Sequence, residues 1–268
     1  MTLVPVAVQD TSGHNVLGLE RDNFRVFDGS EPRPIVSFGR QDAPVSVGIV
    51  FDCSGSMSSK FKVARDAPRQ LFQQLNPEDE AFMVTVSSQA ELLRDFTSNF
   101  DGLGTALLFT QPKGETALID GAYLALAHLA RAHNPRKVLI IVSDGGDNES
   151  RYTLHELEEL AREADTQIFA ICLYQNPNTP EEFSGPELLG KLTGDTGGIR
   201  YLISDPHDMQ ISFAQIGVTV HNEYVLGYYP PTNLPAGKYR KIKVQLNLPE
   251  GHPRCQIYAR TGYYTPER

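Results

Sequence analysis

Residues 45–56 read VSVGIVFDCSGS, in which an uncharged, largely apolar run, 45–51, is followed by a short polar loop. The run 45–51 is typical of a strand that is covered on both faces, as in a parallel sheet. After the loop, residues 60–75 repeat apolar side chains at helical spacing and predict a helix. A buried strand that leads through a polar loop into a helix is the repeating unit of open α/β sheets.

The same alternation continues through the middle of the chain. The pattern predicts strands at 81–86, 138–142, 167–174 and 199–203, a short edge strand at 91–96, and helices at 116–130, 155–164, 186–192 and 209–220. Apolar strands that alternate with helices imply a mostly parallel sheet with helices on both faces. We therefore expect a doubly wound, Rossmann-like α/β domain over residues 43–222.

The two ends of the chain have strand patterns without intervening helices. Strands are predicted at 2–9, 23–27 and 34–38, and again at 224–229, 239–248 and 255–261. Three strands alone make a marginal core, so neither end is expected to fold independently. We expect residues 1–42 and 223–268 to pair into one small all-β, sandwich-like module of six or seven strands, with the α/β domain inserted between them.

Composition excludes several classes of function. A net charge of −9 without a long basic run argues against nucleic-acid binding. No stretch approaches the length of apolar chain that spans a bilayer, and the N-terminus lacks the pattern of a signal peptide. Three cysteines, predicted to be buried or unpaired, do not form a disulfide framework. Two locations stay open: cytoplasmic, or secreted or periplasmic after removal of a leader.

The polar loop offers a carboxylate and two hydroxyls, from Asp52, Ser54 and Ser56. Ligands of open α/β sheets bind beyond the carboxyl ends of the strands, which is where this loop lies. Oxygen donors suit hard cations such as Mg²⁺ and Ca²⁺ rather than zinc or copper.

Two later segments extend this oxygen-donor set. Thr116 opens a predicted helix, and Asp144 follows the most apolar strand, 138–142. Parallel strands at 45–51 and 138–142 are expected to be neighbours, so Asp52 and Asp144 should meet at one edge of the sheet. Two carboxylates held close together repel each other, and a divalent cation removes that cost.

Asp52-x-Ser54-x-Ser56, followed by Thr116 and Asp144, resembles the metal-ion-dependent adhesion site (MIDAS) of von Willebrand factor type A domains. The resemblance covers about residues 45–220, and the β-rich segment before it is similar to a bacterial group of these proteins. It implies that Asp52, Ser54, Ser56, Thr116 and Asp144 bind Mg²⁺, with Mn²⁺ or Ca²⁺ as alternatives. It also implies an adhesion or scaffold function, in which an open coordination position accepts an acidic residue of a partner protein.

One position departs from the family pattern: Glu115 stands where glycine is usual, which puts the identity of the partner in doubt. Taken singly, the serines and Thr116 also suit helix caps, and Asp144 suits a turn. The acidic stretch 144–149 lacks the register of a calcium loop and is expected to be solvated.

Two other functions stay open from the residues alone. One is a structural role, with metal-independent assembly through the β module. The other is a hydrolase or phosphotransferase that uses the Asp52–Ser54 loop, although no catalytic motif accompanies that loop. We expect a binding module and no catalytic residues.

Overall fold

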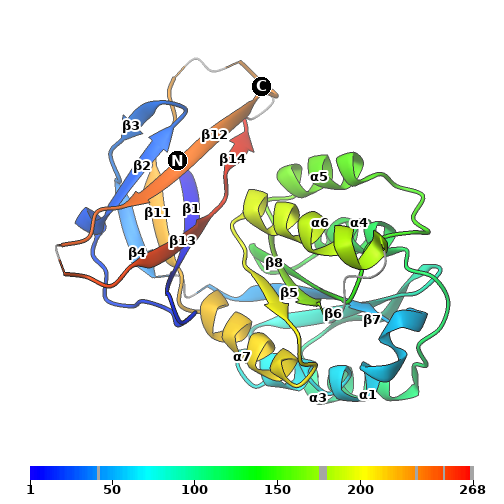
Figure 1. Ribbon diagram of the computed structural model, residues 1–268. Helices are drawn as coiled ribbons and strands as arrows, with labels where there is room; N and C mark the ends of the chain where they lie inside the picture. The colour runs from blue at the N-terminus through cyan, green and yellow to red at the C-terminus, as the bar shows by residue number, and fades with distance from the viewer. Residues whose placement is uncertain (41–42, 175–179, 233–234, 250, 266–268) are drawn as a thin grey trace.

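The computed structural model describes residues 1–40, 43–174, 180–232, 235–249 and 251–265. A six-stranded sheet forms the centre of one half of the molecule (Figure 1). Its neighbouring strands are parallel except for the last pair, which is antiparallel. In spatial order the strands are β10 (Arg200–Ile203), β9 (Gln167–Leu173), β8 (Arg136–Ser143), β5 (Val45–Asp52), β6 (Glu80–Val86) and β7 (Ala90–Thr97).

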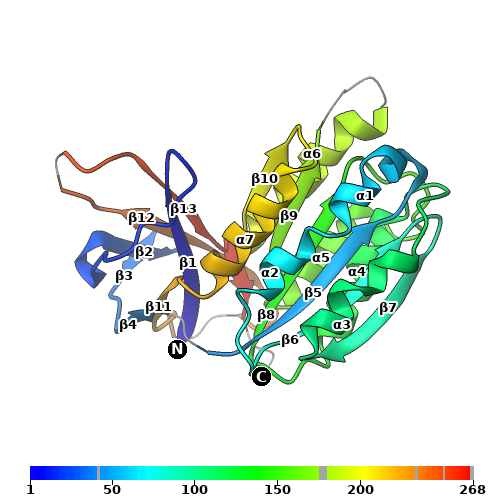
Figure 2. The same ribbon diagram turned by 90° about the horizontal axis from the view of Figure 1, so that it is seen from below.

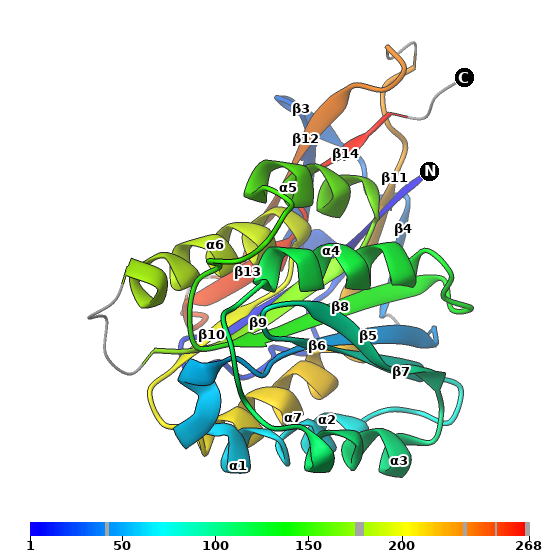
Figure 3. The same cartoon turned by 90° about the vertical axis from the view of Figure 1, so that its right-hand side faces the viewer.

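Helices cover both faces of this sheet (Figure 3). One face carries α4 (Leu118–Leu129), α5 (Leu154–Glu163) and α6 (Pro180–Thr196); the other carries α1 (Phe61–Ala64), α2 (Pro68–Phe72), α3 (Phe100–Gly104) and α7 (Asp208–Val220). A separate apolar cluster fills each side. The doubly wound α/β prediction is therefore confirmed, including the edge position of the strand near residue 91.

The predicted helix over 60–75 is wrong in its continuity. A 3-10 turn, η2 (Gly55–Ser59), precedes this range, and within it the chain forms two short helices, α1 and α2, in place of one. Pro68 is the first residue of α2, and the helical ladder is interrupted before it because proline lacks an amide hydrogen. Two more short 3-10 turns, η1 (Arg21–Asn23) and η3 (Ala106–Phe109), lie in the connections.

The two ends of the chain pair into an all-β module (Figure 2). One sheet has the order β13 (Cys255–Ala259), β1 (Thr2–Asp10), β11 (Tyr224–Tyr228) and β4 (Ser37–Arg40); the other has β14 (Gly262–Tyr264), β12 (Tyr239–Leu246), β2 (Phe24–Asp28) and β3 (Glu31–Arg33). Each sheet mixes strands from both ends, so the insertion of the α/β domain is confirmed.

The strand count of the module is larger than predicted. The strand expected at 34–38 is β4, which is shifted to residues 37–40, and β3 and β14 were not expected. The predicted boundary between residues 42 and 43 falls beside 41–42, which lie outside the described residues, and the division of the chain into domains at 43 and 222 stays a prediction.

A buried carboxylate lies in the core between the two sheets. Asp28 is fully buried at the end of β2 and accepts hydrogen bonds from the hydroxyls of Tyr228, at 3.1 Å, and Tyr263, at 2.9 Å. Arg240 donates to its other oxygen at 2.6 Å. This network joins strands from both ends of the chain.

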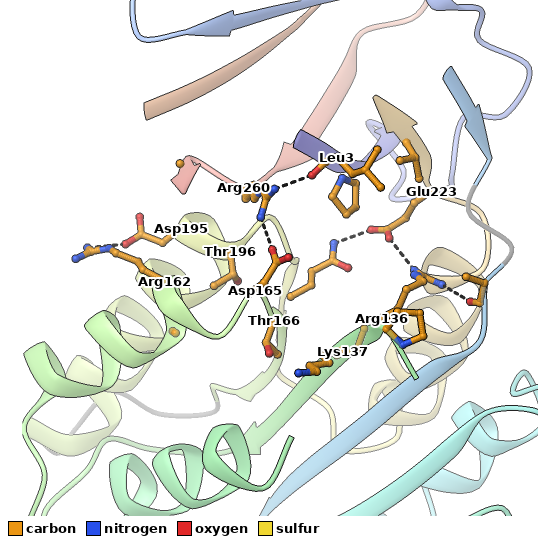
Figure 4. A pocket seen from close by; sticks show the side chains of 18 of the residues that line it. Leu3, Arg136, Lys137, Arg162, Asp165, Thr166, Asp195, Thr196, Glu223 and Arg260 are labelled. Carbon is orange, nitrogen blue, oxygen red and sulfur yellow. Dashed lines mark hydrogen bonds and ion pairs between the residues drawn. The ribbon is translucent and has the colours of Figure 1, made fainter. Parts of the chain in front are cut away.

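A cleft of about 360 Å³ separates the β module from the amino ends of β8 and β9 (Figure 4). Arg136 crosses it and donates to the Ala43 carbonyl, the Val220 carbonyl and the Glu223 carboxylate. Gln167 donates to the other Glu223 oxygen at 2.6 Å. Arg136 thus ties together the two connections between the module and the α/β domain. The other ion pairs that line the cleft are Arg260–Asp165 and Arg162–Asp195.

Candidate metal site

The polar loop after β5 is held in place by backbone hydrogen bonds. Cys53 donates to the Val86 carbonyl of β6 at 2.7 Å and accepts from the Lys113 amide at 2.9 Å. The Ser54 amide donates to Oδ1 of Asp52 at 2.8 Å. Since Asp52 and Ser54 are both buried, the loop points its first oxygen donors inward rather than into solvent.

A second segment packs directly against this loop. The Gly55 amide donates to the Gly114 carbonyl at 2.9 Å. Gly114 has a φ of +76°, and a Cβ there would lie 2.5 Å from Oγ of Ser88, so the close approach requires glycine. Two residues later, this geometry places Thr116 beside the loop.

Helix α4 begins close to the sheet because of a second glycine. A Cβ on Gly121 would lie 2.2 Å from a methyl group of Val86 on β6. Without a side chain there, the first turn of α4 sits against the strand, and the residues that precede it are held at the carboxyl edge of the sheet. Ala117, rather than Thr116, is the N-cap residue of α4, and no side-chain capping bond is made.

The third contribution comes from the end of β8. The Ser56 hydroxyl donates to Oδ1 of Asp144 at 2.8 Å and lies 3.0 Å from the Ser54 hydroxyl. The Ser143 hydroxyl donates to Oδ2 of Asp52 at 2.6 Å. Because β5 and β8 are paired neighbours, the two carboxylates predicted to meet at this edge do so.

Burial dominates the electrostatics of Asp52. It raises the pKa of Asp52 to about 6, although hydrogen bonds from Ser143 and Ser54 act in the opposite direction; the nearby Asp144 carboxylate raises it further. A carboxylate in this setting is poorly solvated, so the ionised form gains from any positive charge brought close to it. Burial also raises the pKa of the neighbouring Cys53 thiol, which stays a buried, free thiol as predicted.

One donor of the set has no protein partner. Among the described residues, no side chain or backbone group hydrogen-bonds to the Thr116 hydroxyl. Its backbone is instead clamped by Asn148, whose side-chain oxygen accepts from the Thr116 amide at 2.8 Å and whose own amide donates to the Thr116 carbonyl. The hydroxyl is thus positioned without being used within the chain.

The donor set fits a hard cation. Hydrogen bonds bring the hydroxyls of Ser54 and Ser56 together with the carboxylates of Asp52 and Asp144, all oxygen donors, which suits Mg²⁺, Mn²⁺ or Ca²⁺. Within the described part of the chain, no group of three or more His, Cys, Asp or Glu side chains is placed to hold a metal. A metal bound at this cluster would therefore need hydroxyl ligands as well; the predicted set is Asp52, Ser54, Ser56, Thr116 and Asp144.

A charged residue that the sequence reasoning missed lies within this cluster. The Lys60 ammonium is 2.6 Å from Oδ2 of Asp144, and both side chains are almost fully buried. Lys60 follows η2 and directly precedes α1. Lys60 begins a predicted amphipathic helix, where a lysine is expected to be exposed, so the sequence did not indicate a buried ion pair. The available signal was its position, four residues after the predicted ligand Ser56.

The expectation of a solvated acidic loop at 144–149 is wrong for residues 144–146, which are buried, whereas residues 148 and 149 are exposed. Asp147 accepts from the Ile119 amide at 2.9 Å in the first turn of α4, and Asn148 holds Thr116. Glu115, the departure from the family pattern, is exposed and accepts a 2.8 Å hydrogen bond from the Asn148 amide group. Its carboxylate has a partner outside the donor set.

The arrangement defines an α/β domain with a polar cluster at the carboxyl edge of its sheet. Residues 47–146 match the family model of the von Willebrand factor type A domain. The chain therefore contains a von Willebrand factor type A domain.

Similar proteins agree with this assignment at the level of fold. The structure of a von Willebrand factor type A protein from Catenulispora acidiphila superposes with a TM-score of 0.59 at 14% identity, covering 98% of this chain and 63% of that one. The von Willebrand factor domain of the type V pili tip protein Mfa5 from Porphyromonas gingivalis gives a TM-score of 0.54 at 15% identity, covering 67% of this chain and 96% of that one.

A curated relative is similar over a shorter stretch. The 26S proteasome non-ATPase regulatory subunit 4 of Drosophila melanogaster is 24% identical over 142 residues. The match covers 52% of this chain and 35% of that protein, so the chain spans about a third of the length of this relative. In the described residues, no helix has both the length and the apolar character needed to cross a membrane.

Proposed function

We propose that this chain is a protein-binding module that takes up a divalent cation, Mg²⁺ in the first instance, and uses it to bind a carboxylate of a partner protein. The observation that carries the proposal is the convergence of two hydroxyls and two carboxylates, from Ser54, Ser56, Asp52 and Asp144, at one edge of the sheet. The Thr116 hydroxyl, which has no partner in the described chain, comes from the segment that packs on this loop. When bound, the ion supplies a position that accepts a carboxylate oxygen.

The proposed function gives different roles to the ligand residues and to the residues that position them. Ser54, Ser56 and Thr116 present hydroxyl oxygens, and Asp52 and Asp144 supply negative charge. Ser143 orients the Asp52 carboxylate. Asn148 holds the backbone of Thr116. These contacts preorganise the donors, which lowers the cost of ordering them when a ligand binds.

Binding is favoured over catalysis by the surroundings of the two serines. The hydroxyls of Ser54 and Ser56 hydrogen-bond to each other and to Asp144. Within the described residues, no histidine hydrogen-bonds to either, so neither serine has the base that a nucleophile needs. By their names, two of the similar proteins are parts of larger assemblies, a proteasome subunit and a pilus tip protein.

Two exposed apolar residues shortly precede the segment that packs on the polar loop. Phe109 is 92% exposed, and Leu108 beside it is 38% exposed. Phe109 is four residues before Lys113, whose amide donates to the Cys53 carbonyl, so the Cα atom of Phe109 lies at most about 17 Å from the polar loop. Exposed aromatic side chains are common anchors of protein interfaces. We assign Phe109 to the contact surface for the partner.

The test is capture by the immobilised chain from a lysate of the organism that encodes it. Proteins retained in Mg²⁺ are eluted with EDTA, and a parallel column carries Asp52→Ala. We expect a partner that elutes with EDTA and is absent from the variant column. A partner that resists EDTA and binds both columns would contradict the proposal and favour metal-independent assembly through the β module.

A further inference from the structure

Lys60 is a buried lysine, with 7% of its surface exposed. Lysine side chains are rarely buried unless they are paired. The pair here is with Asp144, at 2.6 Å from Nζ to Oδ2, and the carboxylate has no exposed side-chain surface. The other oxygen of Asp144 accepts from Ser56, which belongs to the proposed ligand set. Lys60 therefore binds directly to a proposed metal ligand.

The backbone holds Lys60 in this position. Its amide donates to the Met57 carbonyl at 2.9 Å, closing the 3-10 turn that follows Ser56. Its own carbonyl accepts from the amides of Val63 and Ala64, the last two residues of the short helix α1. The ammonium thus enters the site from the same turn that carries Ser56, and it stays tethered there at high local concentration.

We propose that Lys60 is a built-in counter-ion of the metal site, which competes with the divalent cation for Asp144 and weakens its binding. The proposal rests on the function proposed above. Without a divalent ion, the ammonium neutralises one of the two buried carboxylates. With the ion bound, the two carboxylates, the ammonium and the ion leave a surplus of one positive charge. A single partner carboxylate cancels that surplus. Lys60 therefore lowers the affinity of the site for the divalent ion and favours an anionic partner.

The chain provides a matched control. Lys62 lies two residues further along α1 and is exposed. Lys60→Met removes the charge and keeps most of the side-chain volume, whereas Lys62→Met makes the same change in solvent. Lys60→Arg keeps the charge at the site.

The experiment is calorimetric titration of Mn²⁺ into the EDTA-stripped full chain. We expect Lys60→Met to bind Mn²⁺ at least about tenfold more tightly than wild type, because a like charge close to the ion has been removed. Lys62→Met and Lys60→Arg should bind as wild type does. Equal or weaker binding by Lys60→Met, with binding by wild type intact, overturns the inference and leaves the proposed function standing.

Two further outcomes separate the inference from the proposed function. Binding of Mn²⁺ by Lys60→Met but not by wild type would support the inference in its strongest form, with the ammonium blocking the site. Failure of both proteins to bind Mn²⁺, Mg²⁺ or Ca²⁺ would overturn the metal-dependent function and the inference together. Should Lys60→Met be unfolded without metal, Lys60→Gln is titrated in its place. The inference then also requires that Mn²⁺ raises the midpoint temperature of thermal unfolding more for both variants than for wild type.

Discussion

The Ser143 hydroxyl donates a 2.6 Å hydrogen bond to Oδ2 of Asp52, joining the carboxyl ends of β8 and β5 at the centre of the proposed site. Both side chains are fully buried. Ser143 is thus a positioning residue, which orients a carboxylate without belonging to the proposed ligand set. Its effect is measurable in the absence of any metal.

Ser143→Ala should therefore lower the free energy of unfolding by about 2 kcal/mol, because a buried carboxylate loses a donor that water cannot replace. Urea unfolding of the EDTA-stripped protein measures the change. The control is Ser98→Ala, which alters an exposed serine and should leave the stability unchanged. Equal stability of Ser143→Ala and wild type would show that the hydrogen bond does not hold Asp52.

Phe109→Ser should weaken capture of the partner by about tenfold, since an exposed aromatic anchor of an interface contributes on the order of 1–2 kcal/mol. Binding of Mn²⁺ should not change, because Phe109 contributes no ligand. Ile211→Ser, which removes an exposed apolar side chain from α7, is the control and should capture as wild type does. Loss of capture in both variants, or in neither, argues against a specific role for Phe109.

We predict that stability depends on pH through Glu223, a buried carboxyl group that lines the cleft between the two halves. Burial raises the pKa of Glu223 from an ordinary value of 4.5 to about 7, although Arg136, Gln167 and His221 act in the opposite direction. Between these two values the folded protein binds more protons than the unfolded chain, so this contribution to stability is full below pH 4.5 and is lost as the pH rises through 7.

Glu223→Gln should remove this contribution and flatten the dependence between pH 4.5 and 7. Urea unfolding at half-unit intervals of pH provides the comparison, with Glu163→Gln as the control at an exposed position. A profile of Glu223→Gln that is parallel to that of wild type across this window would show that the carboxyl group titrates normally.

Asp28 supplies a test of the β module that is independent of the metal site. Asp28→Ala should destabilise the protein by about 3 kcal/mol, because it leaves two buried tyrosine hydroxyls and the Arg240 guanidinium without their acceptor. Asp22→Ala changes an exposed carboxylate and should have little effect. A loss of less than about 0.5 kcal/mol in Asp28→Ala would mean that the network adds little to the stability of the module.

The periodicity of the sequence predicted the parts of the fold that depend on burial. Strands β5 and β8 are apolar because both of their faces are covered, and these apolar runs allowed their positions to be predicted from the sequence. The inserted arrangement followed from strand-rich ends that were each too short to form a core. The break before Pro68 was missed because the apolar spacing continues across it, although proline marks such a break in the sequence.

The candidate site was predictable where residue type and spacing carry the chemistry, as for Asp52, Ser54 and Ser56. Its supporting contacts were not. Lys60 and Asn148 act through tertiary contacts across 84 and 32 residues of sequence, and nothing in their local pattern distinguishes them from solvent-exposed polar residues. The proposed metal ligands themselves stay a prediction until binding is measured.

The central claim is most directly tested by thermal unfolding of the EDTA-stripped protein with Mg²⁺, Mn²⁺ or Ca²⁺ added, for wild type, Asp52→Ala and Thr116→Val. An ion that binds only the folded state stabilises it by about 2.7 kcal/mol at a hundredfold excess over its Kd. We predict that the ion clearly raises the midpoint temperature of unfolding of wild type, raises that of Thr116→Val by less, and leaves that of Asp52→Ala unchanged. If all three proteins shift equally, or if no ion shifts wild type and none binds Lys60→Met, this cluster is not a metal site.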